Sequence, residues 1–242
     1  MKRLLPALLI MALLAALVYT VTLMPPMGSA DNPTAVNTIP RYFERGAEEA
    51  GTENIVTGIV LNYRGYDTMG EVTVIFSALT AVLAVITRGE KRPFPNQNGS
   101  PEVRPTLFIR TVTGFLIPFI ILFSFYVILH GDVSPGGGFQ GGAIIGAVLI
   151  ISAMVFGPSE FSKLLPDRAR IPFEGTAVIT FFVTGILGVL SGTNFLTYIL
   201  PGIAPGLQPI LRTLMLLFLE AGIGIGGAVI FVSIFFAMLK EE

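Results

Sequence analysis

The sequence predicts an all-α, polytopic membrane protein with about six transmembrane helices and both termini in the cytoplasm. Of the 242 residues, 52% are hydrophobic and 13% are charged, whereas a soluble domain carries roughly 25% charged residues. So little polar surface cannot cover a water-soluble globule. The apolar residues also gather in runs of about the length that crosses a bilayer, and the positive charges between the runs favour one side.

Six apolar runs are long enough, or nearly so, to cross the hydrocarbon core at about 1.5 Å per helical residue. These predicted spans are Leu4–Met24, Thr68–Thr87, Leu107–Leu129, Phe139–Phe156, Thr176–Leu190 and Leu214–Leu239. The first run follows Lys2 and Arg3 and could be read as a secretory signal. Because it exceeds the usual signal core of about 7–15 residues, we expect a retained helix.

The Lys and Arg residues predict the orientation of these spans. If the spans alternate in direction, most of the 15 positive residues fall on the side that holds both termini. The opposite side receives Arg41, Arg45, Arg64 and Arg212. Since the more positive side of a membrane protein is normally the cytoplasmic one, we expect a multi-pass protein of a prokaryotic cell membrane with cytoplasmic termini.

A stretch rich in Pro, Asn and Gly, Arg92–Pro105, cannot be helical and predicts a boundary. It divides the chain into a two-helix module over residues 1–91, a cytoplasmic linker over 92–105 and a four-helix module over 106–242. Before the second span, the polar stretch Pro25–Glu53 is expected outside the membrane. Its portion Arg41–Ala50 could form an amphipathic helix on the membrane surface.

The composition excludes several classes of site. Cysteine is absent and there is one histidine, so disulfides, Cys-ligated zinc, iron–sulfur clusters and multi-His metal or haem sites are excluded within this chain. We therefore expect no cofactor here, and any redox chemistry must lie on another polypeptide. A net charge of −1 gives no basic surface for nucleic acid.

The first group of charged residues, Arg64, Asp67 and Glu71, opens the second span. Asp67 and Glu71 are four residues apart, so both face the same side of a helix. A carboxylate inside an apolar run is costly unless it faces protein, water or a cation. Glu71 is therefore either a proton or cation relay group tuned by its neighbours, or part of an ion network that fixes the start of the helix.

The second group lies in the joint between the third and fourth spans. His130 and Asp132 are close enough to share a proton. They form an external proton or ion entry group, or else His130 is a hydrogen-bonded histidine at the membrane interface. The glycines that follow permit close approach of backbone segments and predict a tight turn packed against neighbouring helices. These predicted packing positions are Gly136, Gly137, Gly138, Gly141 and Gly142.

The third group surrounds Glu220 in the last span, where no Lys or Arg lies close along the helix. Glu220 is either a protonatable or cation-binding group, or a buried protonated side chain bonded to a Ser, Thr or Asn such as Asn194. The glycines after it predict close helix packing. They are Gly222, Gly224 and Gly226.

The four-helix module resembles the B-type subunit, MnhB or MrpB, of the multi-subunit Na⁺/H⁺ antiporters of the Mrp or Mnh family. The resemblance covers Leu107–Leu239 and is carried by three stretches. They are Phe125–Gly131 followed by Pro135–Gly142, Ser191–Leu196, and Phe218–Ile223. The carboxylate in the last stretch is often an Asp in that family, so Glu220 is a conservative variant. The Val133-Ser134 insert departs from the usual joint.

The two-helix module is similar, over Asn54–Thr87, to the C-terminal end of the large A-type antiporter subunit, through the stretch Tyr63–Glu71. Similar modules occur in the antiporter-like membrane arms of energy-converting hydrogenases and sulfur reductases. The resemblance implies movement of Na⁺ or H⁺ across the bilayer by an assembly of antiporter-type membrane subunits. It also implies a possible peripheral arm with iron–sulfur clusters, so that this chain is not an enzyme by itself.

Three hypotheses for function remain open from the sequence. The chain is an ion-translocating module in which Glu71, His130 and Glu220 line the path, or a structural subunit that bridges antiporter and redox subunits. A stand-alone secondary transporter is the third hypothesis, which the small number of spans and of polar membrane residues opposes.

Overall fold

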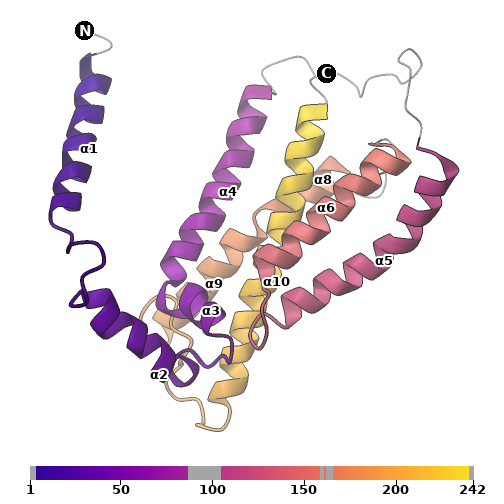
Figure 1. Ribbon diagram of the computed structural model, residues 1–242. Coiled ribbons are helices and arrows are strands. Elements are labelled where there is room, and N and C mark those ends of the chain that lie inside the picture. Colours follow the sequence, from indigo (N-terminus) through magenta and orange to yellow (C-terminus); the bar gives the residue numbers. More distant parts are fainter. Residues whose placement is uncertain (1–3, 87–104, 159–160, 162–165, 240–242) are drawn as a thin grey trace. The chain divides into compact units, whose positions relative to one another are not determined.

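The computed structural model describes residues 4–86, 105–158, 161 and 166–239, and every regular element within these ranges is helical. The chain forms two compact units, Met1–Arg45 and Gly46–Glu242. Figure 1 shows the helices of both. Apart from Pro105, the predicted linker lies outside the described residues.

The first unit contains helix α1 (Leu4–Thr22), a short π-helix (Thr34–Thr38) and the start of α2 (Ile39–Ala50). Helix α1 corresponds to the first predicted span, but its described apolar part, Ala7–Thr22, is shorter than the other candidate spans. A sixth membrane crossing therefore stays a prediction. Helix α2 covers the predicted amphipathic segment and begins two residues earlier.

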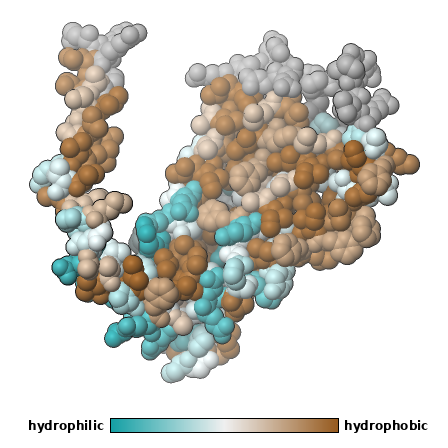
Figure 2. Space-filling view, in the orientation of Figure 1, coloured by the Kyte–Doolittle hydropathy of each residue, from teal (hydrophilic) through white to brown (hydrophobic). Residues whose placement is uncertain are grey.

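The second unit contains five helical segments that are long and apolar enough to cross a membrane. They are α4 (Gly65–Ile86), α5 (Leu107–Leu129), α6 (Gly138–Phe156), the pair α8 (Asp167–Glu174) and α9 (Thr176–Leu190), and α10 (Gln208–Leu239). Hydrophobic side chains cover the helices in Figure 2. The predicted all-α, polytopic membrane fold is confirmed, whereas the cytoplasmic position of the termini stays a prediction.

Helix α10 packs against α4, α5, α6, α8 and α9. It begins at Gln208, six residues before the predicted span, because Pro209 and Arg212 interrupt the apolar run without interrupting the helix. Its 32 residues extend about 48 Å at 1.5 Å per residue, which exceeds the roughly 30 Å of a hydrocarbon core. One end of α10 therefore reaches beyond the bilayer core.

Three polar segments gather at one end of this unit, which we call the loop end (Figure 1). They are residues 46–64, which include α3 (Ile55–Thr57) and a π-helix (Gly58–Tyr63), the α5–α6 loop at residues 130–137, and the α9–α10 loop at residues 191–207. Next to these segments lies a buried hydrophobic core that contains Leu61, Val72 and residues of α9 and α10, such as Phe181 and Leu219.

Candidate functional site

Glu220 is buried, with 5% of its surface exposed, where α10 passes the start of α6. The backbone N–H of Gly138, the first residue of α6, donates a hydrogen bond to Glu220 Oε2. The first N–H groups of a helix have no partner within the helix and carry the positive end of its dipole. The carboxylate thus satisfies a donor that would otherwise be left unpaired in a buried place.

Glycine permits this contact. Gly137 has φ +131°, a conformation that side chains rarely adopt, and a Cβ there would lie about 3.0 Å from the carboxylate. A Cβ on Gly138 would lie 2.9 Å from Glu220 Oε2. The sequence-based alternative that paired Glu220 with Asn194 is wrong, because the carboxylate instead bonds to the backbone of Gly138 at the start of α6.

Two rows of residues, all of them small except Glu220, lie where α6 packs against α10. Gly138 meets Glu220, Gly142 meets the backbone of Gly224, and Gly146 meets the carbonyl of Ala228. Members of each row are four residues apart, so each row lies along one face of its helix, and both rows run in the same direction. Gly146 and Ala228 were not among the packing positions predicted from the sequence. Their spacing could have identified them, because Gly146 follows Gly142 by four residues and Ala228 follows Gly224 by four residues.

The other predicted packing glycines serve different neighbours. Gly222 and Gly226 face α9, where they contact Thr180, Thr176 and Ala177. Gly136 lies against the carbonyl of Val127, and Gly141 against Ser124 and Ile128 of α5. The glycines of α10 therefore alternate between two sides, and this alternation lets one helix approach both α6 and α9 closely.

The structure does not join His130 to Asp132. The His130 ring stacks on Tyr126 with ring centres 4.2 Å apart, and its Nδ1 lies 3.1 Å from the Tyr126 carbonyl oxygen. Asp132 instead interacts electrostatically with Glu220. The electrostatic partner of Glu220 at the start of α6 is therefore Asp132, whereas the recorded contacts of the His130 ring are with Tyr126.

A set of hydrogen bonds, here called the knot, ties the α5–α6 loop to the segment before α4. Asn54 Nδ2 donates to the carbonyls of Gly131 (2.8 Å) and Ser134 (2.7 Å). Thr57 Oγ1 donates to the Gly131 carbonyl at 2.5 Å, and Thr52 Oγ1 donates to the Asp132 carbonyl at 2.5 Å. The knot thus places residues of the first predicted module over the loop that contains Asp132.

Tyr198, in the α9–α10 loop, is a further buried polar residue that the sequence analysis missed. Its hydroxyl donates to the Leu61 carbonyl in the segment before α4. Burial raises the pKa of Tyr198 above its usual value, and the negative charge of Glu220 acts in the same direction. Because the phenol retains its proton, Tyr198 remains a hydrogen-bond donor in the range where proteins normally function.

The remaining predicted residues lie elsewhere. Arg64 and Asp67 form an exposed ion pair, with Arg64 Nε 2.6 Å and Nη2 2.5 Å from Asp67 Oδ2. Glu71 is exposed on the surface of α4, so the structure does not bring it to the buried Glu220. Exposed pairs of this kind contribute little stability.

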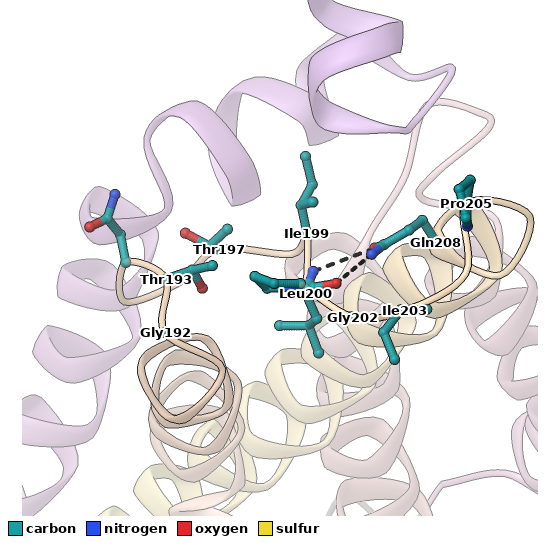
Figure 3. A pocket seen from close by; sticks show the side chains of 11 residues that line it. Gly192, Thr193, Thr197, Ile199, Leu200, Gly202, Ile203, Pro205 and Gln208 are labelled. Atoms are coloured by element: carbon teal, nitrogen blue, oxygen red, sulfur yellow. Dashed lines mark hydrogen bonds between the residues drawn. The ribbon is translucent and has the colours of Figure 1, made fainter.

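Among the described residues, two hollows at the loop end are lined by no residue that was predicted for ion movement. The larger, of about 650 Å³, lies within the α9–α10 loop (Figure 3). There the side-chain amide of Gln208 accepts a hydrogen bond from the backbone N–H of Leu200 and donates one to the Leu200 carbonyl. The smaller, of about 240 Å³, is lined by Glu49, Tyr63 and Tyr198 among others. Within the described residues, no cluster of three or more His, Asp or Glu could hold a metal ion.

Known proteins resemble this chain in sequence. An uncharacterised protein of Methanocaldococcus jannaschii is 26% identical over 158 residues, which are 59% of each chain. The B-type Na⁺/H⁺ antiporter subunit of Bacillus subtilis is 33% identical over 92 residues, which are 38% of this chain and 64% of the relative. The matches thus span about three fifths of the length of these two relatives.

Two solved structures resemble the fold. A chain of the membrane-bound sulfane sulfur reductase, an archaeal respiratory membrane complex, matches over 100% of both chains with a TM-score of 0.65 and 29% identity. A chain of the Mrp complex from Dietzia sp. DQ12-45-1b matches over 96% of this chain and 26% of that one, with a TM-score of 0.58 and 22% identity. The first likeness is to a chain of a membrane complex, and the second shows the fold alone.

Family models cover both parts of the chain. Residues 4–104 match the MbhE family, which is described as a subunit of MBH. Residues 108–238, more than half of the chain, match a second family over the glycine-rich α5–α6 loop, α6 and the Glu220 region of α10. The chain therefore belongs to the family of domains related to the MnhB subunit of the Na⁺/H⁺ antiporter.

Proposed function

We propose that this chain is a membrane subunit of a multi-subunit assembly that moves Na⁺ or H⁺ across a prokaryotic cell membrane, with Glu220 as an ion-carrying group. The chain is not an enzyme by itself. The assembly is either a Na⁺/H⁺ antiporter or the antiporter-like membrane arm of a respiratory complex. The likeness over the whole of this chain to a chain of the sulfane sulfur reductase favours the second form. In that form, a redox arm with iron–sulfur clusters would lie on other subunits.

The observation that carries the proposal is the environment of the Glu220 carboxylate. The carboxylate is buried, accepts a hydrogen bond from the N–H of Gly138 at the start of α6, and lies within electrostatic reach of Asp132. An ionisable group buried in a membrane helix is a candidate for ion movement, because a proton or a cation can compensate its charge. A carboxylate that merely filled space would not need two glycines and a second acidic residue beside it.

The position of Glu220 along α10 also supports an ion-carrying role. Helix α6 is 19 residues long, about 29 Å, which is close to the thickness of a hydrocarbon core. Because Glu220 lies at the start of α6, it is placed near one boundary of that core and beneath the loop end. An ion that entered at the loop end would therefore reach Glu220 near the start of its passage.

The test is Glu220→Gln in the assembled complex. We expect at least a tenfold loss of Na⁺-dependent proton movement in membrane vesicles, measured with a pH-sensitive dye, while native gels show normal assembly. Gln retains an oxygen that accepts from Gly138, so the fold is expected to persist. Glu71→Gln is the matched control variant, because it neutralises a carboxylate at an exposed position of another helix. Normal exchange in assembled Glu220→Gln vesicles would refute the role of Glu220.

A second candidate function is a purely structural bridge between larger subunits. The knot favours it, since Asn54 and Thr57 join the two predicted modules into one unit. On this view, neutralising Glu71, Glu220 and Asp132 together would leave ion movement unchanged, and bulky residues at Gly224 would abolish assembly. The triple variant thus separates the two functions.

A further inference from the structure

A second carboxylate is held at the opposite end of the helices from Glu220. The hydroxyl of Ser233 on α10 donates to Glu174 Oε1 at 2.6 Å. Ser233 is 5% exposed. Glu220 and Ser233 are separated along α10 by about 20 Å at 1.5 Å per residue, so the two carboxylates lie towards opposite ends of one continuous helix.

Glu174 lies at a break in a membrane span. The apolar segment Arg168–Leu190 is long enough to cross the bilayer, but it is divided into α8, which ends at Glu174, and α9, which begins at Thr176. Pro172 within α8 and Gly175 between the helices account for the break. Interrupted backbone at membrane depth is tolerated where it is buried in protein or lines a wet cavity.

Charged groups near Glu174 are few. Arg170, one turn earlier on α8, is 5% exposed, lies over the ring of Phe236 at 4.9 Å and interacts electrostatically with Glu174. Among the side chains that the structure describes, α8 also carries Arg168, which is exposed, and α9 carries no charge. The charged residues of α10, Arg212 and Glu220, lie towards the loop end. In the described part of the chain, the groups recorded as interacting with Glu174 are thus the guanidinium of Arg170 and the hydroxyl of Ser233.

Hydroxyl groups occupy the interval between the two carboxylates. Thr176, Thr180 and Thr184 are four residues apart and share one face of α9, and Thr180 and Thr184 are buried. Thr176 Oγ1 donates to the Gly222 carbonyl at 3.1 Å. A Cβ on Gly226 would lie 3.0 Å from the same hydroxyl oxygen. The interface between α9 and α10 therefore places a row of hydroxyls against the glycine-lined backbone of α10, beside apolar contacts such as that of Phe181 and Leu219.

We infer that Glu174 and Ser233 form a second proton-exchange site, at the end opposite the loop end, joined to Glu220 by the hydroxyl-lined interface of α9 and α10. This inference rests on the proposed function. Glu174 takes a proton from water at that end onto a carboxylate oxygen. Ser233 then accepts a hydrogen bond from the new carboxylic acid where it had donated one, and the proton is later released towards the hydroxyl row.

A proton suits the site better than a metal cation. One carboxylate and one hydroxyl are too few ligands to replace the hydration of a cation, and the positive charge of Arg170 repels one. A proton needs only a single carboxylate oxygen.

The first experiment measures exchange by the complete complex in vesicles. We expect Glu174→Gln to lower the rate at least fivefold with assembly intact, and Glu53→Gln, an exposed carboxylate at the loop end, to leave it unchanged. Should Glu174→Gln fail to assemble, Ser233→Ala decides, since it keeps the charge and is expected to shift the pH profile of exchange. A different outcome would overturn the inference and leave the proposed function standing. In that outcome, Glu220→Gln loses exchange activity, whereas Glu174→Gln and Ser233→Ala both retain a normal rate and a normal pH profile of exchange.

The second experiment tests whether water reaches the interface. The chain contains no cysteine, so single substitutions can be read by the mass of this subunit after treatment with a small charged thiosulfonate. We expect Ser233→Cys and Thr180→Cys to be modified, because the reaction requires a hydrated thiolate. Ala153→Cys, buried in an apolar cluster beside Val232 and Phe236, is the matched control. Protection of all three positions would contradict the hydrated interface.

Discussion

The backbone N–H of Gly138 meets the carboxylate of Glu220, which joins the first residue of one membrane helix to the interior of another. The contact is possible because α6 and α10 run in parallel with glycines at matching intervals. It also places Asp132, on the loop just before α6, within electrostatic reach of Glu220. One hydrogen bond therefore fixes the register of two helices and the surroundings of the principal ionisable group.

The glycine rows predict an asymmetric response along α10 and α6. A Cβ on Gly142 would lie 2.6 Å from the carbonyl oxygen of Gly224, whereas a Cβ on Gly227 would meet nothing within 4 Å. We expect Gly142→Ala to lower stability by about 1–3 kcal/mol through overpacking. Gly227→Ala in the same bundle should have little effect. Thermal unfolding of the purified complex in mild detergent measures both, and equal behaviour of the two variants would contradict the packing.

The knot predicts a cost for removing a single hydroxyl. Thr57→Val keeps the side-chain volume but removes the bond to the Gly131 carbonyl, which still accepts from Asn54. The expected loss is therefore close to that of one net hydrogen bond, about 1 kcal/mol. Thr73→Val is the control, because the Thr73 hydroxyl bonds to Met69 of its own helix. Limited proteolysis of the α5–α6 loop should quicken in the first variant only.

Alanine substitutions at Gly51 and Gly28 separate the effect of backbone strain from that of steric conflict. Gly51 has φ +70°, and a Cβ there would collide with the side chain of Arg212, which donates to the Glu48 carbonyl at 3.0 Å near the end of α2. Gly28 has φ +80° with open space around it. Both changes to Ala carry the strain of a left-handed backbone, about 1–2 kcal/mol.

Only Gly51→Ala should displace Arg212 from the Glu48 carbonyl, so its melting temperature should fall further than that of Gly28→Ala. Adding Arg212→Ala to Gly51→Ala should cost less than Arg212→Ala costs alone, because the arginine contact is already lost. Strict additivity in this double-mutant comparison would mean that the glycine and the arginine do not interact.

Burial of Tyr198 predicts that part of the protein's loss of stability at alkaline pH comes from this residue. Its pKa is raised in the folded protein by burial, so its stabilising contribution is complete below the ordinary tyrosine pKa of about 10 and declines as pH rises beyond it. Each further pH unit below the folded pKa removes up to about 1.4 kcal/mol. Melting temperature measured between pH 8 and 11 should therefore fall less steeply in Tyr198→Phe than in the unaltered chain. Tyr126→Phe, at an exposed ring, should retain the full slope.

Much of the fold could be predicted from the sequence because bilayer thickness fixes the length of an apolar run. The predicted spans Leu107–Leu129 and Thr176–Leu190 coincide with α5 and α9. The start of α10 was predicted too late, since a helix supported by the polar segments of the loop end need not be apolar. The break at Glu174 was also missed, because hydropathy does not record backbone direction.

Composition and runs of neighbouring residues were enough to predict that the chain is helical, resides in a membrane and carries carboxylates inside apolar segments. Which of these carboxylates are buried, and which groups face them, depends on contacts between helices that are distant in the sequence. Glu71 and Glu220 both lie in apolar runs of the sequence, yet one is exposed and the other meets Gly138. The difference arises because partners such as a backbone N–H from 82 residues away belong to other helices, and no local pattern specifies them.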